Sequence, residues 1–186
     1  MTTVAIIGDG PAGLSAALFL AKNGHQAIVY GQDKTAMHFA QLHNYLGIDD
    51  ISGTDFQTAA RAQVAGFGAD LRDEKVEAVT QTEEGFSVRA GDGMVDADYL
   101  ILAGAKATRQ LAEELGVDIT DDRAQVDTEN RTNVDRVYAV GRLARANRSQ
   151  AIISAGAGAV AALDILSREE GKDVHDWDTP PKEDSE

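Results

Sequence analysis

Thr3-Val4-Ala5-Ile6-Ile7-Gly8-Asp9-Gly10-Pro11-Ala12-Gly13 decides the fold of this 186-residue chain. Its first five residues are mostly β-branched and apolar, which predicts a buried parallel strand. A helix is expected over residues 11–23, with Gly24 as its C-cap, and a second strand over residues 26–30. A strand, a glycine turn, a helix and a strand within about 30 residues predict a βαβ unit with a right-handed crossover.

The glycines of this turn have the spacing of a dinucleotide-binding loop. Gly8 permits the tight turn, Gly10 lets the backbone approach a pyrophosphate, and Gly13 lets the helix pack close to the strand. The amides at the helix start would then face the phosphates. We therefore predict that the whole loop binds a cofactor, including Asp9, Pro11 and Ala12.

One expected feature of such a site is missing. An acid normally follows the second strand and binds a ribose hydroxyl, but Tyr30-Gly31-Gln32 stands there. Asp33 is one substitute. The interpretation we favour makes Asp33 a solvated loop acid and lets the ribose meet Gln32 or backbone.

The middle of the chain predicts a loop, a helix and a meander. Residues 36–53 lack periodicity and indicate an ordered loop over a ligand. Thr54-Asp55-Phe56-Gln57 fits a capping box for a helix that ends near Gly66 or Gly68. Antiparallel strands are expected between residues 76 and 96, and a buried strand over residues 99–103.

The last third predicts four further elements. A short helix is expected over residues 108–115, a short strand over 124–128 and a buried strand over 137–140. Ser149 is placed to cap a long helix over residues 150–168. Small residues on one face of this helix predict close packing: Ala151, Ala155, Gly158 and Ala162.

Together these elements predict one Rossmann-like α/β domain over residues 1–170, with helices on both faces of a parallel sheet and a small antiparallel meander. Residues 171–186 read as an acidic tail that is mobile unless Trp177 docks. The length suits a single compact domain.

The composition limits the partners. Lys and Arg number 17 against 31 Asp and Glu, a net charge of −14, which argues against nucleic acid and anionic membrane surfaces. Asp exceeds Glu and Arg exceeds Lys, so we hypothesise a halophilic source. The chain has no cysteine and therefore no dithiol. With no signal-peptide pattern, we expect a cytoplasmic protein.

Several motifs in order resemble thioredoxin reductase and its relatives, over about residues 3–166. They are the glycine loop, His43-Asn44-Tyr45-Leu46-Gly47, Phe67-Gly68-Ala69, Leu102-Ala103-Gly104-Ala105 and the stretch Thr132 to Gly141. The resemblance implies a flavin adenine dinucleotide (FAD) domain of the two-dinucleotide-binding class. It also implies that Asn44 lies near the flavin and that backbone at Val76 contacts adenine.

The chain departs from the family at two places. Ala103 stands where the family has threonine, although Gly104 still allows a close backbone approach. The family ends its late motif with an aspartate that binds the ribityl chain, whereas here Gly141 is followed by Arg142, which has no acceptor. Arg142 either reaches a phosphate or points to solvent. By the same resemblance, Gln150 and Ala151 place a helix N-terminus near the flavin, where Arg145 and Arg148 add positive charge.

The interval between these motifs is short. Thioredoxin reductases insert their nicotinamide domain and redox cysteines where this chain has only residues 105–131, and one βαβ unit alone needs about 30 residues. We therefore expect an FAD-binding redox protein, not a thioredoxin reductase, that exchanges electrons with an external partner or small substrate. The alternatives are a non-enzymatic nucleotide-binding or regulatory module and direct binding of a nicotinamide dinucleotide at the glycine loop.

The remaining polar residues offer no chemistry of their own. The four histidines lack metal-ligand spacing, so we predict no metal site and no catalytic side chain. His43 is the one worth testing as a proton carrier if Asn44 lies near the flavin. A homodimer is implied by the resemblance alone.

Overall fold

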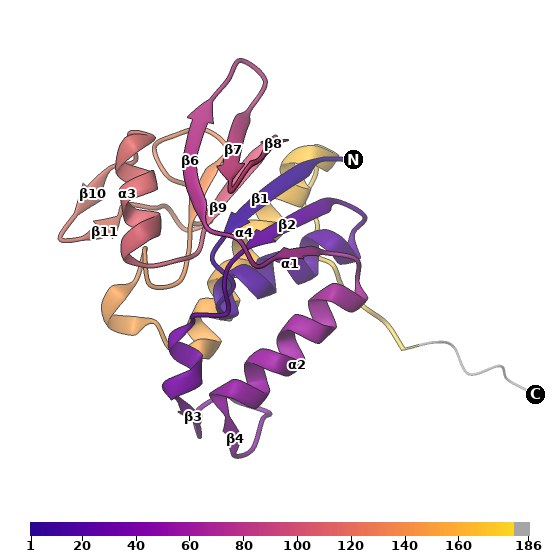
Figure 1. Cartoon of the computed structure of the whole chain (residues 1–186). Helices are drawn as coiled ribbons and strands as arrows, with labels where there is room; N and C mark the ends of the chain where they lie inside the picture. Colours follow the sequence, from indigo (N-terminus) through magenta and orange to yellow (C-terminus); the bar gives the residue numbers. More distant parts are fainter. Residues whose placement is uncertain (181–186) are drawn as a thin grey trace, which may run out of the picture.

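A five-stranded parallel sheet forms the centre of the computed structural model, which describes residues 1–180 (Figure 1). The strand order is β12-β9-β1-β2-β5. β1 (Thr3–Ile7) and β2 (Gln26–Tyr30) have the predicted bounds, and β9 (Tyr99–Leu102) and β12 (Val137–Ala139) end one residue early. The edge strand β5 (Asp70–Arg72), which pairs with β2, was not predicted.

The two faces of this sheet are covered by different elements. α1 (Pro11–Lys22), α2 (Gly53–Gly66) and α4 (Ala151–Glu170) lie on one face and bury Val4 and Ile6. Ala5 and Ile7 point to the other face, as alternation along a strand requires. That face is covered by α3 (Lys106–Glu114) and by an antiparallel sheet of β6 (Val76–Gln81), β7 (Phe86–Ala90) and β8 (Gly93–Ala97).

α1 and α4 pack in backbone contact, as the small-residue face predicts. A Cβ at Gly158 would lie 2.0 Å from the carbonyl oxygen of Ala12, so only glycine fits there. α4 is long and apolar enough to cross a membrane by length and composition, but half of its apolar window is buried inside the domain. Burial against α1 and the sheet therefore accounts for its composition.

The helix caps differ from those predicted. α2 begins at Gly53, with Ser52 as its N-cap, and the Ser52 hydroxyl accepts a hydrogen bond from the amide of Asp55. The prediction of Thr54 as the N-cap is therefore wrong. The helix starts one residue earlier because Gly53 packs against Met37, where a Cβ at Gly53 would lie 1.9 Å from the Met37 carbonyl oxygen. Ser149 does not cap α4 either. Its hydroxyl donates to the carbonyl of Ala146 within η2 (Ala146–Arg148).

Three other segments complete the description. The strand predicted over residues 124–128 is instead a hairpin of β10 (Ile119–Thr120) and β11 (Arg123–Ala124), because Asp121 and Asp122 adopt positive φ angles and reverse the chain. The loop over residues 36–53 contains η1 (Ala36–Phe39), β3 (Gln41–Leu42) and β4 (Ile51–Ser52). Trp177 is 85% exposed, so it does not dock, and residues 181–186 of the predicted tail lie outside the described residues.

Candidate cofactor site

A cavity of about 450 Å³ opens at the carboxyl ends of β1, β9 and β12. The chain passes from β1 to β2 on one side and returns as β9 on the other, so the cavity lies at a topological switch point, where such sheets bind ligands. Its volume is in the range of small-molecule sites. The lining residues are Gly8, Asp9, Gly10, Pro11, Ala12, Lys34, Thr35, Ala36, Met37, Phe39, Ala103, Gly104, Ala105, Gly141, Arg142, Ser149, Ala151 and Ser154.

The glycine loop forms the floor of this cavity, and its geometry requires glycine. Gly8 has a φ of +119°, and a Cβ there would lie 2.8 Å from the backbone of Ala103 and Gly104. A Cβ at Gly13 would lie 1.9 Å from the carbonyl oxygen of Gly8. β1, β9 and α1 therefore meet so closely that positions 8 and 13 have no room for a side chain.

Three helices begin at the cavity. α1, α3 and α4 start beside the lining residues Pro11, Ala105 and Ala151. None of the three has a side-chain hydrogen bond at its N-cap or an acid in its first turn. The first amides of a helix lack intrahelical acceptors and carry partial positive charge, so the cavity is suited to an anionic group such as a pyrophosphate.

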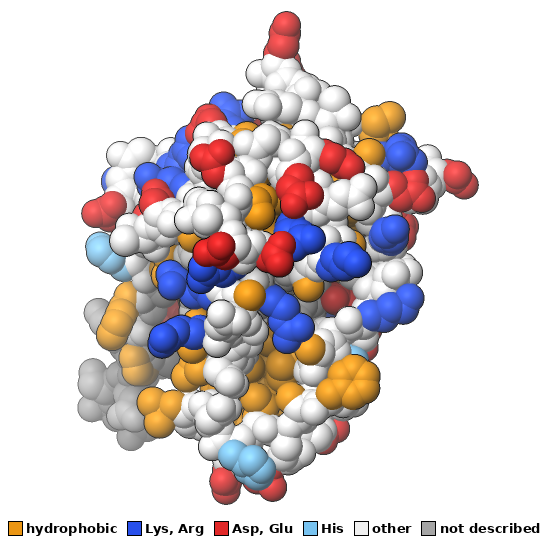
Figure 2. Space-filling model, turned by 90° about the vertical axis from the view of Figure 1, so that its left-hand side faces the viewer, with side chains coloured by type: hydrophobic (Ala, Val, Ile, Leu, Met, Phe, Trp, Pro, Cys, Tyr) orange, Lys and Arg blue, Asp and Glu red, His pale blue; other side chains and the backbone are white. Residues whose placement is uncertain are grey.

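Cationic residues lie in the lining of the cavity or close to the lining residues in sequence. We call Lys106, Arg142, Arg145 and Arg148 the basic rim; all four are exposed, and none has a carboxylate within 4.0 Å among residues 1–180. On the face shown in Figure 2, Lys and Arg side chains gather in a band above a hollowed apolar area. The rim stands out because most other cations of this acidic chain are paired.

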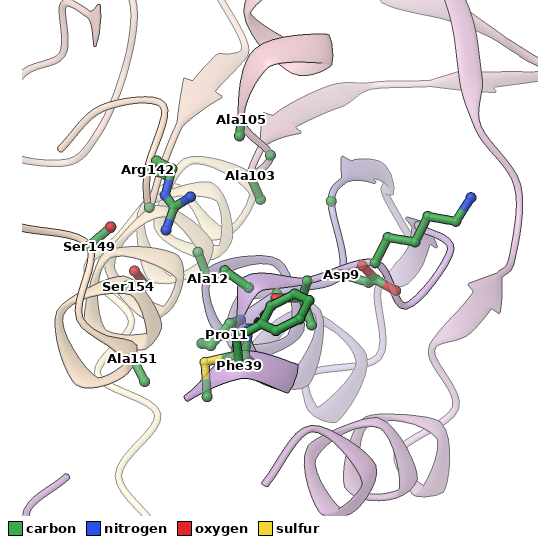
Figure 3. Close-up of a pocket in the computed structure, with 18 residues that line it drawn as sticks. Asp9, Pro11, Ala12, Phe39, Ala103, Ala105, Arg142, Ser149, Ala151 and Ser154 are labelled. Atoms are coloured by element: carbon green, nitrogen blue, oxygen red, sulfur yellow. Dashed lines mark hydrogen bonds between the residues drawn. The ribbon is translucent and has the colours of Figure 1, made fainter. Parts of the chain in front are cut away.

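The structure brings ten of the predicted site residues to the cavity. They are Gly8, Asp9, Gly10, Pro11, Ala12, Ala103, Gly104, Gly141, Arg142 and Ala151. Figure 3 shows Arg142 and Ser149 on one side of the cavity and Asp9 on the opposite side. Arg142 lines the cavity wall, and its side chain is also exposed to solvent.

The other predicted residues do not line the cavity. Asn44 and Gln150 are joined by a hydrogen bond of 3.3 Å, which brings the two positions expected near the flavin together. Tyr30 is buried and accepts a hydrogen bond from Arg72. Val76, the first residue of β6, is buried in the core. Gly13 packs under the loop, Gly31 packs against Asp9, and Gln32 is exposed.

Sequence reasoning missed the residues just after the second strand. Lys34, Thr35, Met37 and Phe39 line the cavity, and the Thr35 hydroxyl accepts a hydrogen bond from the amide of Met37 to start η1. The predicted loop over a ligand, residues 36–53, includes Met37 and Phe39 but not Lys34 and Thr35. Phe39 is 94% exposed, so it adds an apolar edge at the mouth.

A polar network around the buried Asp164 anchors the late motif to α4. Arg131 pairs with Asp164 through two hydrogen bonds, and the hydroxyl of Tyr138 donates to the same carboxylate over 2.6 Å. Burial raises the pKa of Tyr138, and the bond to Asp164 raises it further. Burial opposes ionisation of Asp164, but hydrogen bonds from Arg131 and Tyr138 outweigh it and lower its pKa. The network fixes β12, which delivers Gly141 and Arg142 to the cavity.

Comparison with known proteins identifies this arrangement. Residues 50–162 match the family model described as pyridine nucleotide-disulphide oxidoreductase. The chain belongs to this family. Residues 3–80 match the model described as FAD binding domain. The chain is thus a thioredoxin reductase-like FAD-binding domain, which confirms FAD as the predicted cofactor.

Individual relatives agree with the family match. The chain is 35% identical over 112 residues to the thioredoxin reductase of Mycolicibacterium smegmatis, which covers 58% of this chain and 36% of that protein. It is 31% identical over 119 residues to NADPH-dependent thioredoxin reductase 3 of Arabidopsis thaliana, covering 58% and 22%. The chain therefore spans about a third or less of the length of these relatives.

A solved structure shows the same fold. The thioredoxin reductase from Gloeobacter violaceus superposes with a TM-score of 0.83 at 17% identity, over 97% of this chain and 99% of that one. This likeness confirms the predicted α/β fold with a parallel sheet and small antiparallel sheets.

Proposed function

We propose that this chain is an FAD-dependent redox protein that exchanges electrons with an external partner or a small substrate. One observation carries the proposal: β9 and β12 are adjacent parallel strands, and the residues between them form only α3 and a two-stranded hairpin. No cysteine is present to relay electrons. The cofactor site is thus formed without a nicotinamide domain between β9 and β12.

The residues of the cavity suit the parts of FAD. The glycine loop and the start of α1 would bind the pyrophosphate, and the start of α4, with Asn44 and Gln150 beside it, would border the flavin. The positive end of α4 would favour negative charge on a reduced ring. When bound, FAD supplies transfer of one or two electrons, and the chain supplies binding and orientation.

The basic rim supports an anionic partner or substrate. The chain as a whole carries a net charge of −14 and repels anions, but the rim gives the cavity mouth the opposite sign. Local charge of this kind steers association with oppositely charged molecules. We infer that this partner is a small acidic protein or an anionic small molecule, met in the cytoplasm.

The visible spectrum of the purified protein tests this function. Flavin absorbance, with FAD released on denaturation, supports it, whereas a colourless protein that does not bind added FAD overturns it in favour of a non-enzymatic module. Anaerobic mixing with NADH or NADPH comes next. Rapid bleaching by either would contradict the need for another donor.

Arg142 provides a second test. Replacing it by aspartate restores the family's acceptor but removes a cation from the cavity wall. If Arg142 binds a phosphate, Arg142→Asp weakens FAD binding. Tighter binding in the variant would mean that the natural residue weakens the flavin site, which favours the alternative of a module that has lost redox activity.

A further inference from the structure

Among the described residues that line the cofactor cavity, Asp9 is the only acid. Its side chain is 8% exposed, and its Oδ2 accepts hydrogen bonds from the amide of Asp33 over 2.8 Å and from Arg61 Nη1 over 2.7 Å. The buried side-chain amide of Gln57 donates to the Asp9 carbonyl over 2.6 Å. Two separate segments, the loop after β2 and the helix α2, therefore fix the position of Asp9.

The Asp9 side chain occupies the space that a side chain at the end of β2 would need. The three atoms nearest to a Cβ built at Gly31 are all in the Asp9 side chain, at 2.1, 2.4 and 2.5 Å. With Asp9 in place, only glycine fits at position 31. No acid directly follows β2, but the carboxylate of Asp9 reaches the same place from the glycine loop.

The second oxygen of this carboxylate is without a hydrogen-bond partner in the part of the chain that the structure describes. Asp9 Oδ1 accepts no hydrogen bond from residues 1–180, and it is not among the enclosed polar atoms that lack a partner. Neither of the other predicted ribose contacts lines the cavity: Gln32 is exposed, and Asp33 Oδ1 is enclosed, without a hydrogen bond, 3.2 Å from His38 Nε2. Oδ1 is therefore the free carboxylate acceptor in the cavity.

The place of Asp9 indicates which part of the cofactor it meets. Figure 3 shows it across the cavity from Arg142 and Ser149, which stand beside the start of α4, at the flavin side of the site. The opposite end, next to β2, corresponds to the nucleoside end of a dinucleotide. A ribose there presents two vicinal hydroxyl groups as donors.

We propose that the Asp9 carboxylate binds an adenosine ribose hydroxyl of the cofactor and replaces the acid missing after β2. Arg61 acts as a positioning residue, since it holds Oδ2 and leaves Oδ1 for the ligand. The inference rests on the proposed FAD function. A hydrogen bond to a charged group makes Asp9 a determinant of affinity for the nucleoside half.

Competition between ADP analogues and FAD tests the contact itself. Against the wild-type protein, 2′-deoxy-ADP or 3′-deoxy-ADP should compete about tenfold or more less tightly than ADP, the effect of losing a hydrogen bond to a charged group. Against Asp9→Ala, ADP and both analogues should compete equally. If both deoxy analogues match ADP on the wild-type protein, or if the variant still distinguishes them, the proposal is wrong.

An exchange of positions tests the replacement. Asp9→Gly should bind FAD at least tenfold more weakly than the wild type, and adding Gly31→Glu to it should recover most of that loss, because the side chain that blocks position 31 is gone. Gly31→Glu alone should not bind better than the wild type. Circular dichroism and thermal unfolding establish that each variant is folded.

The two proposals fail in different ways. A wild-type protein that binds no FAD overturns the proposed function. A wild-type protein that binds FAD as tightly as Asp9→Ala overturns only the role of Asp9.

Discussion

Replacing Gly158 by alanine should separate α1 from α4. The added Cβ would lie 2.0 Å from the carbonyl oxygen of Ala12 and 2.9 Å from its carbon, against an ordinary contact of at least 3.4 Å. The overlap is therefore 3.4 − 2.0 = 1.4 Å with backbone, which cannot rotate away. The helices must shift apart instead, and overpacking of this kind costs about 1–3 kcal/mol.

Gly156 in the same helix provides the matched control. A Cβ there meets no atom within 4 Å, so Gly156→Ala gains only the helix propensity of alanine, about 1 kcal/mol. Both variants receive this gain, and the difference between them isolates the contact with Ala12. A gap of 1–3 kcal/mol corresponds to roughly 2–12 °C in melting temperature for a domain of this size.

Thermal unfolding of the two variants without cofactor measures this gap. Gly156→Ala should melt a few degrees above the wild type and Gly158→Ala below Gly156→Ala. Because Ala12 lines the cavity in the first turn of α1, Gly158→Ala should also bind FAD more weakly, whereas Gly156→Ala should not. Equal melting temperatures and equal FAD affinities would refute the reasoning from close helix packing.

Three further outcomes are expected. Asp164→Asn should lower the free energy of unfolding by roughly 1–3 kcal/mol at pH 7. Because folding lowers the pKa of Asp164, the difference in unfolding free energy between variant and wild type should shrink as the pH falls below the ordinary pKa of 3.8. A difference that does not change with pH in urea titrations would contradict this. In the same titrations, Ser52→Ala should lower the free energy of unfolding by about 1 kcal/mol and Thr54→Ala by less than half of that. A larger loss for Thr54→Ala would mean that Thr54 is the cap of α2, as the sequence predicted. After anaerobic reduction of the flavin, Arg145→Glu combined with Arg148→Glu should slow oxidation by ferricyanide and speed oxidation by hexaammineruthenium(III) in stopped-flow measurements, and equal effects on both oxidants would exclude steering by the basic rim.

The parallel sheet could be predicted because each of its central strands has a signal in its own short stretch of sequence. Each central strand is an apolar run that ends at a turn residue, and the glycine loop lies between a buried strand and an amphipathic helix, the context that its spacing requires. β5 was missed because Asp70 and Arg72 are polar edge residues, which lack the apolar run of a buried strand. The cap of α2 was missed because it depends on the fit of Gly53 beneath Met37, a contact between separate elements.

The sequence predicted the parts of the site that are formed by backbone. It did not predict the contacts between side chains that are far apart in the sequence. The glycine loop, Gly104 and Gly141 were named from spacing, and they line the cavity. The exchange between Asp9 and Gly31 involves residues 22 positions apart and becomes visible only when both are placed in space. The pairing of Arg131 with Asp164 spans 33 positions and has no local signal.

The contact between α1 and α4 also governs when the protein can acquire its cofactor during synthesis. The first residues of the two helices, Pro11 and Ala151, are separated by 151 − 11 = 140 positions. At about 5–20 residues per second, the ribosome needs roughly 7–28 s to make the chain between them. Through that time the glycine turn lacks the helix that packs against it, so a nascent chain should capture FAD only after residue 170 has emerged.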